Sequence, residues 1–167
     1  MAYYQRDLLP ALGLPPETNE LILGGLRELA TQADAVPVGR TVTFRPDGVL
    51  QLGGATWQVI HAPGHADAQT IFYQPDTRQL LSADMLLAVT PAPVIDHPPP
   101  GEQREPALPD FIRSLDLLDA LDIDTVYPGH GRPFGDHRAV IARQRERIAS
   151  RKAQCLELIR EGQATIP

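Results

Sequence analysis

The middle of the chain carries short apolar segments that are rich in β-branched and aromatic residues, a composition typical of β-strands. Turn-forming residues separate these segments, among them Pro46-Asp47-Gly48, Gly53-Gly54 and Pro75-Asp76-Thr77. The pattern predicts a meander of strands joined by tight turns. The expected strands are Val42–Phe44, Val49–Leu52, Thr56–Ile60, Thr70–Tyr73 and Gln79–Leu81.

Helical periodicity is found on both sides of this meander. The pattern before it predicts a short helix from Tyr3 to Leu12 and a second helix over residues 17 to 32. The second helix carries an apolar stripe made of Leu21, Leu23, Leu26 and Leu29. The segments expected after the meander are a helix at Asp110–Leu121, a strand at Asp124–Tyr127, and a long polar helix that begins at Asp136 or His137 and ends at Gly162.

This order of elements predicts an α+β fold in which helices pack on a mixed sheet. We expect a single domain with a helical lead-in at residues 1–33, the sheet and its turns at residues 40–135, and a C-terminal helix at residues 136–162. The segment from Pro91 to Pro109 contains seven prolines and is too long for a simple connector. We expect it to be a functional or mobile loop.

Composition narrows the classes of function. The chain has 167 residues, of which 43% are hydrophobic, and no apolar run is long enough to span a membrane. Cys155 is the only cysteine, which fits a reducing, cytoplasmic location, and we expect it to be half-buried in the last helix. The net charge of −6 argues against binding to nucleic acid. The basic residues clustered on the last helix are expected to form a solvated face; they are Arg143, Arg145, Arg147, Arg151 and Lys152.

Three motifs place a possible metal ligand just after an apolar strand. They are Val59-Ile60-His61-Ala62-Pro63-Gly64-His65, Leu80-Leu81-Ser82-Ala83-Asp84, and Val126-Tyr127-Pro128-Gly129-His130-Gly131. Histidine and carboxylate suit zinc, iron and manganese, and rigid turns after strands hold such ligands in place. Each motif alone is weak evidence, because a single His after a strand is more often structural and a single Asp is more often a cap. The three motifs together, in this order, favour a metal site.

The chain resembles the metallo-β-lactamase superfamily through these motifs, and more closely its branch of glyoxalase-II-like hydrolases. The resemblance implies the C-terminal portion of a four-layer αβ/βα sandwich, with His65 and His130 each binding one of two metal ions and Asp84 bridging both. Ala83 stands where the family usually has glycine. It also implies two zinc ions, with iron or manganese as alternatives, and a bridging water activated by the metals and held by Asp84 as the catalytic group.

The family's hallmark His-x-His-x-Asp-His is absent from these 167 residues. We therefore expect this chain to be the C-terminal part of a longer hydrolase, with an incomplete metal site and no activity by itself. His61 is interpreted as a structural or supporting residue, His97 as an exposed residue of the proline-rich loop, and His137 as a surface residue.

Small acyl compounds such as thioesters, lactones or β-lactams are the expected substrates of the intact protein. A non-catalytic family member that keeps the fold is the main alternative, while a redox di-iron protein and a nucleic-acid-processing enzyme are two others. The family fold buries two sheets against each other. We therefore expect the sheet face left uncovered in this chain to self-associate, most simply as a homodimer, or else to aggregate.

Overall fold

The computed structural model describes residues 6, 9–11, 13–32, 37–41, 43, 45, 47–91, 93–94 and 106–162. The chain divides into two compact units. Met1–Thr43 and Gln154–Pro167 form the first unit, and Phe44–Ala153 forms the second. None of the described helices combines the length and the apolar character that crossing a membrane requires.

The first unit contains helix α1 (Leu9–Ala11), helix α2 (Pro16–Gln32) and the short 3-10 helix η2 (Val38–Arg40). Helix α2 matches the expected helix, but its apolar stripe does not form one buried face. Leu23 is buried, whereas Leu21 and Leu29 are 77% and 63% exposed. The spacing of apolar residues indicates which side chains share a helix face, and it does not show that another element covers that face. Cys155 is also exposed, which corrects the expectation that it is half-buried.

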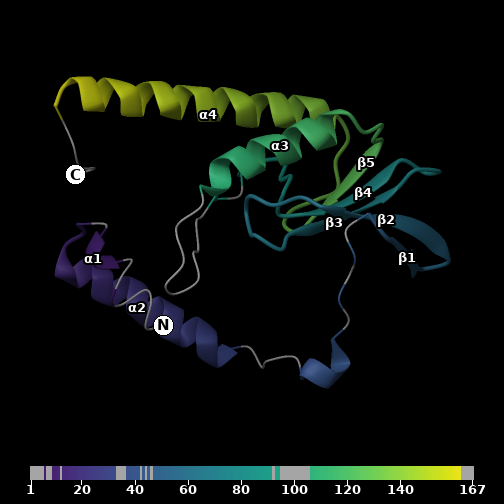
Figure 1. Cartoon of the computed structure of the whole chain (residues 1–167), viewed down its shortest axis with the longest axis horizontal. Helices are drawn as coiled ribbons and strands as arrows, with labels where there is room; N and C mark the ends of the chain where they lie inside the picture. Colours follow the sequence, from purple (N-terminus) through teal and green to yellow (C-terminus); the bar gives the residue numbers. More distant parts are fainter. Residues whose placement is uncertain are drawn as a thin grey trace. The chain divides into compact units, whose positions relative to one another are not determined.

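The second unit is built on a five-stranded sheet with the strand order β1-β2-β3-β4-β5 (Figure 1). The strands are β1 (Val49–Leu52), β2 (Ala55–His61), β3 (Thr70–Gln74), β4 (Gln79–Ala83) and β5 (Thr125–Pro128). Neighbouring strands from β1 to β4 are antiparallel, as the predicted meander requires, and β5 is parallel to β4. Val42 and Phe44 lie outside the described residues, and Thr43 is not part of a strand.

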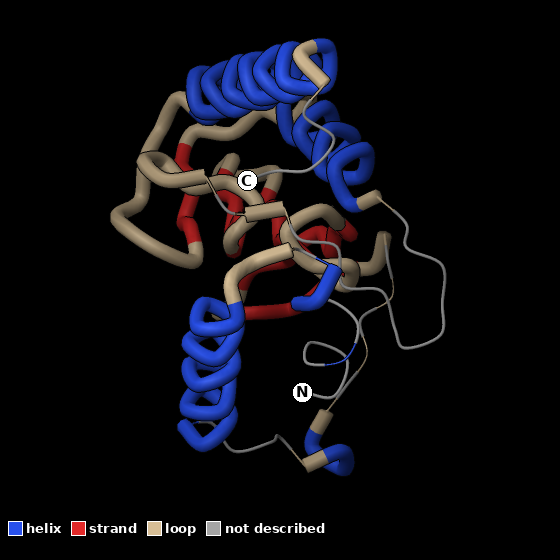
Figure 2. Tube along the Cα trace, turned by 90° about the vertical axis from the view of Figure 1, so that its left-hand side faces the viewer, coloured by secondary structure: helices blue, strands red, loops and turns tan. Residues whose placement is uncertain are grey.

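Two helices cover the same face of this sheet (Figures 1 and 2). They are α3 (Ala107–Asp119) and α4 (His137–Arg160). Helix α3 begins three residues before the expected start at Asp110, because Pro109 fits the first turn of a helix, where its missing N–H costs nothing. The core cluster joins this face of the sheet to both helices: Ile71, Tyr73, Leu80 and Val126 pack with Phe111, Leu115, Leu118, Val140 and Ile141.

The opposite face of the sheet is also apolar. Residues directly opposite each other in the ladder point to the same face, and the register places Val59 beside Phe72, Phe72 beside Leu81, and Leu81 beside Tyr127. Val59 is buried, Phe72 and Leu81 are half-buried, and Tyr127 is 37% exposed. We call Leu50, Leu52, Trp57, Val59, Phe72, Leu81 and Tyr127 the outer face.

Candidate metal centre

The sheet topology explains why three separate motifs meet. Strand β2 is antiparallel to β3, β3 is antiparallel to β4, and β4 is parallel to β5. Strands β2, β4 and β5 therefore run in the same direction, and their C-terminal ends lie at one edge of the sheet. His65 follows β2, Asp84 follows β4 and His130 follows β5.

Asp84 lies between the two histidines. Its Oδ2 atom is 3.6 Å from His65 Nε2 and 3.5 Å from His130 Nε2. The side chains of His65 and Asp84 are each 27% exposed, and that of His130 is 79% exposed. The arrangement is thus a shallow, solvent-accessible cluster with the carboxylate at its centre.

The ring orientation of His65 is fixed by a hydrogen bond to the segment that follows Asp84. His65 Nδ1 lies 2.8 Å from the carbonyl oxygen of Pro93, and because a carbonyl can only accept, Nδ1 carries the proton. Neutral His65 therefore has its lone pair on Nε2, which faces the Asp84 carboxylate. Two electron-rich atoms that face each other in this way favour a cation between them, and a Nδ1–H bond to a backbone carbonyl is typical of histidine ligands.

Glycines allow the ligand turns to approach neighbouring elements closely. A Cβ atom on Gly129 would overlap the Asp84 carboxylate, and a Cβ atom on Gly64 would lie 2.6 Å from Phe111 Cβ. Gly64 also has φ 141°, a conformation that side-chain-bearing residues rarely adopt. The Pro-Gly-His turns therefore require glycine for steric reasons.

Ala83 occupies a position that suits glycine. Its φ is 45°, in the left-handed region, and it lies where the register between β4 and β5 shifts. The backbone conformation explains why the departure from glycine noted in the sequence matters: alanine carries a steric cost there.

Two serines that the sequence analysis did not single out hold the ligand segments in place. Ser114 Oγ donates to the carbonyl of Pro63 at 2.8 Å, which ties α3 to the turn that carries His65. Ser82 Oγ donates to the carbonyl of Leu86 at 3.0 Å, which folds the chain back just after Asp84. Only the contacts identify these serines, because serine beside a turn is too common to signal a role.

The donors fit a metal by type, but their number is small. Two ligands of one tetrahedral zinc ion are separated by about 3.3 Å, given bond lengths of about 2.0–2.2 Å, and each His–Asp84 separation is close to that value. Among the described residues, however, no group of three or more His, Cys, Asp and Glu side chains is arranged to hold one ion. A catalytic zinc usually has three protein ligands, so the described donors amount to part of a centre.

The other three histidines lie outside this cluster or outside the described residues. His61 Nε2 lies 2.7 Å from the carbonyl oxygen of Asp67, a structural contact within its own loop. His97 lies outside the described residues. His137 is 2% exposed, which corrects the expectation of a surface residue. Burial lowers the pKa of His137, followed in size by the positive charge of Arg138, and the Leu121 and Ile123 carbonyls oppose this shift.

Four of the five basic residues of α4 are exposed, as expected, and Arg145 is half-buried. Arg145 is paired with Asp116 at 2.6 Å and with Asp119 at 2.7 Å, and its hydrogen bond lowers the pKa of Asp119. Arg143 donates to the carbonyl of Ala88 at 3.2 Å, and Arg147 lines a pocket with it. Arg151 and Lys152 are exposed, as expected.

The family model of the metallo-β-lactamase superfamily matches residues 6–130. The chain therefore belongs to the metallo-β-lactamase superfamily, and its mixed sheet flanked by helices is the fold of that family's members. Among solved structures, a metallo-β-lactamase family protein from Thermus thermophilus is similar with a TM-score of 0.65 and 23% identity. That similarity covers 94% of this chain and 51% of the other.

Two curated relatives are similar in sequence. The probable metallo-hydrolase YqjP of Bacillus subtilis (strain 168) is 30% identical over 165 residues, which cover 98% of this chain and 50% of that protein. The linear primary-alkylsulfatase of Pseudomonas sp. (strain ATCC 19151) is 30% identical over 132 residues, 77% of this chain and 24% of that protein. The chain thus spans half of the first relative and about a quarter of the second.

Proposed function

We propose that this chain supplies the C-terminal part of a dinuclear metal centre in a hydrolase of small acyl compounds. The observation that carries the proposal is the position of Asp84 Oδ2, 3.6 Å from His65 Nε2 and 3.5 Å from His130 Nε2. Asp84 would contact both ions, and His65 and His130 would each bind one. Zinc is the proposed metal, with iron or manganese as alternatives.

A metal pair at this centre would supply hydroxide at neutral pH and polarise the bond under attack. The chain's own residues would hold the geometry. The Pro93 carbonyl orients His65, Ser114 anchors the His65 turn, and Gly129 leaves room for the Asp84 carboxylate. Such precise support is what a catalytic metal centre needs.

The charge distribution supports small substrates over nucleic acid. Arg78, Arg138 and Arg145 are paired with aspartates within 4.0 Å, so these arginines are not free to follow a phosphate backbone. Thioesters, lactones and β-lactams are the acyl classes we propose, in line with a glyoxalase-II-like branch. The similarity to an alkylsulfatase suggests alkyl sulfate esters as a second class of substrate to test.

Metal titration tests the centre. We expect Co²⁺ or Zn²⁺ to bind the purified chain weakly, because each ion would have one histidine and a shared carboxylate, and we expect Asp84→Asn to abolish this binding. Glu146→Gln, a change of the same kind at a position on α4, should leave it unaltered. Equal binding by wild type and Asp84→Asn would refute the centre.

Turnover distinguishes an incomplete centre from a complete one. We expect no hydrolysis of thioester, lactone or β-lactam by the 167-residue chain alone. Stoichiometric zinc that resists EDTA, together with turnover by this chain, would contradict the incomplete site. If a longer protein carrying His-x-His-x-Asp-His ahead of this sequence also binds metal without turnover, the non-catalytic alternative is supported.

A further inference from the structure

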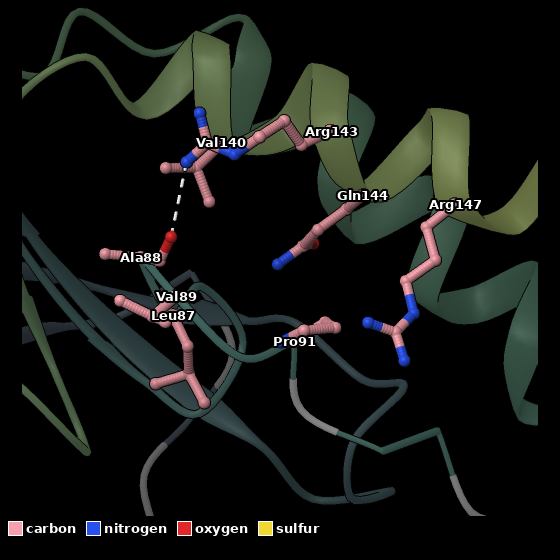
Figure 3. Close-up of a pocket in the computed structure, with 8 residues that line it drawn as sticks. All are labelled: Leu87, Ala88, Val89, Pro91, Val140, Arg143, Gln144 and Arg147. Atoms are coloured by element: carbon pink, nitrogen blue, oxygen red, sulfur yellow. Dashed lines mark hydrogen bonds between the residues drawn. The ribbon is translucent and has the colours of Figure 1, made fainter.

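A pocket of about 210 Å³ lies between α4 and the segment that follows Asp84 (Figure 3). All of its lining residues belong to the unit that contains the sheet. Leu87, Ala88, Val89 and Pro91 form one wall, and Val140, Arg143, Gln144 and Arg147 of α4 form the other.

Gln144 is a buried polar residue without a partner in this pocket. It is 6% exposed, and among the described residues neither its Oε1 nor its Nε2 atom has a hydrogen-bond partner. Figure 3 shows its carboxamide extending from α4 toward the opposite wall. Burying an unpaired amide costs free energy, and native proteins rarely keep one without a reason. A ligand that supplies a donor or an acceptor would remove this cost.

Two guanidinium groups flank the carboxamide. Arg143 and Arg147 are four residues apart on α4, so they lie on the same side of the helix. Arg143 donates to the carbonyl of Ala88 at 3.2 Å, which fixes its guanidinium beside the pocket and leaves other N–H groups available. The wall formed by the described residues contains no Asp or Glu. This combination favours an oxyanion, because guanidinium groups bind carboxylate, sulfate and phosphate through paired N–H donors.

The rest of the wall is apolar. Leu87, Val89, Pro91 and Val140 offer aliphatic surface and no side-chain hydrogen-bonding group. A free inorganic anion would leave this surface uncovered, whereas an aliphatic chain attached to the anion would cover it. The pocket therefore matches a small amphiphilic anion.

The pocket adjoins the candidate metal centre through one short segment. Asp84 stands just before this segment, Leu87 to Pro91 line the pocket, and Pro93 accepts the hydrogen bond from His65. The pocket wall is therefore two residues away in sequence from the carbonyl that orients a proposed metal ligand.

We infer that this pocket binds a small aliphatic anion, a carboxylate or an alkyl sulfate, with Arg143, Arg147 and Gln144 on the anionic group and the aliphatic wall on its chain. Binding at this pocket does not depend on the proposed function. A role in positioning the substrate of the metal centre does depend on it.

Calorimetric titration of the purified metal-free chain with octanoate, octyl sulfate and octanol tests the inference, with EDTA present so that the metal centre cannot contribute. Octanoate and octyl sulfate should bind saturably, and octanol should bind at least about tenfold more weakly, because it lacks the charge that pairs with the arginines. Binding of octanoate but not octyl sulfate would indicate a carboxylate site, and binding of octyl sulfate but not octanoate would indicate a sulfate site. Either outcome supports an anion pocket. Equal binding of octanol would overturn it.

Two variants and one control locate the binding. Arg147→Gln should weaken octanoate binding about tenfold, and the control Arg151→Gln, one turn further along α4, should not. Gln144→Met keeps the volume, so it should weaken binding while maintaining or raising the thermal midpoint, because an unpaired buried amide is removed. Octanoate should also shift the amide NMR signals of Leu87 to Val89. Unchanged affinity in both variants, a lowered midpoint in Gln144→Met, or an absence of binding by both anions would refute the site.

Discussion

Asp84 and Gly129 are packed so closely that no side chain could be present on Gly129. An added Cβ atom would overlap the Asp84 carboxylate and would also lie 3.1 Å from the carbonyl carbon of Ala83. The Gly129 N–H donates to the Ala83 carbonyl at 2.8 Å, so the turn after β5 is bonded to the turn after β4. The glycine of the Pro-Gly-His-Gly motif thus sets the position of the carboxylate as well as that of His130.

Gly129→Ala should displace Asp84. We expect the affinity of the chain for Co²⁺ to fall about ten- to hundredfold, as when a supporting group of a metal ligand is lost. The free energy of unfolding should fall by about 1–3 kcal/mol, the usual effect of overpacking. Absorbance titration with Co²⁺ and urea denaturation measure the two effects.

Gly135→Ala is the control for that substitution. Its added Cβ would meet only the carbonyl oxygen of Asp124 at 3.4 Å, an ordinary contact distance. Metal affinity should therefore stay within about twofold of wild type, roughly 0.4 kcal/mol. If Gly129→Ala behaves like Gly135→Ala, the Asp84 carboxylate is not constrained by this turn.

Ala83→Gly should stabilise the protein. Ala83 has φ 45°, a conformation that costs a residue with a Cβ atom about 1–2 kcal/mol. Glycine avoids this steric cost, but its greater freedom in the unfolded state offsets part of the gain. We expect a net gain of about 1 kcal/mol in the free energy of unfolding, measured by urea denaturation. Ala55→Gly, in strand β2, is the matched control and should be destabilising. A loss of stability in Ala83→Gly would contradict the argument.

Gly64→Ala should be more damaging than most surface substitutions. Its Cβ would lie 2.5 Å from Phe111 Cα and 2.6 Å from Phe111 Cβ, so α3 and the His65 turn would have to move apart. We expect a loss of about 2–3 kcal/mol in the free energy of unfolding. A thermal midpoint equal to that of wild type would mean that the turn and α3 are not in contact in solution.

His137 should make stability depend on pH. Its pKa in the folded protein is lowered, chiefly by burial, so the folded state favours the neutral ring. As the pH falls below the ordinary histidine value of about 6.5, the unfolded state binds a proton more readily, and stability is lost until the folded-state pKa is passed. Urea denaturation from about pH 7.5 down to about pH 5 should show this slope. His137→Gln should have a smaller slope, and an equal slope in both proteins would rule out His137 as the cause.

We propose that the outer face pairs with a second copy of the chain. Leu52 on β1 is 51% exposed and Tyr127 on β5 is 37% exposed there, while Phe72 and Leu81 between them are half-buried, and exposed apolar surface of this kind usually marks an interface. Light scattering of the wild type should show a dimer, and Leu52→Lys should shift it toward monomer. Val49→Lys is the control, because Val49 is 68% exposed but points to the other face of β1. A monomeric wild type at high concentration would exclude this pairing.

The strands were predictable because each one is a short apolar run between turn residues, and period-two patterning leaves little freedom of register. The three candidate ligands were singled out because the order and turn context of their motifs resemble those of the metallo-β-lactamase superfamily. Burial of single polar residues was not predictable. His137 and Gln144 belong to a helix that is polar on average, and only the packing of α4 on the sheet determines that they are buried. The strained conformation of Ala83 likewise depends on the register shift beside it.

The parallel pairing of β4 and β5 has a consequence for the order of folding. Strands β1 to β4 pair through connections of at most eight residues, whereas Arg78 at the start of β4 pairs with Asp124 at the start of β5 across 46 residues. Closing so long a loop is slow compared with forming hairpins. His65 and Asp84 would therefore be in position early, and His130 would arrive with the last strand. The two halves of the candidate centre should then gain protection from hydrogen exchange at different times during refolding, the β5 amides after those of β2 to β4.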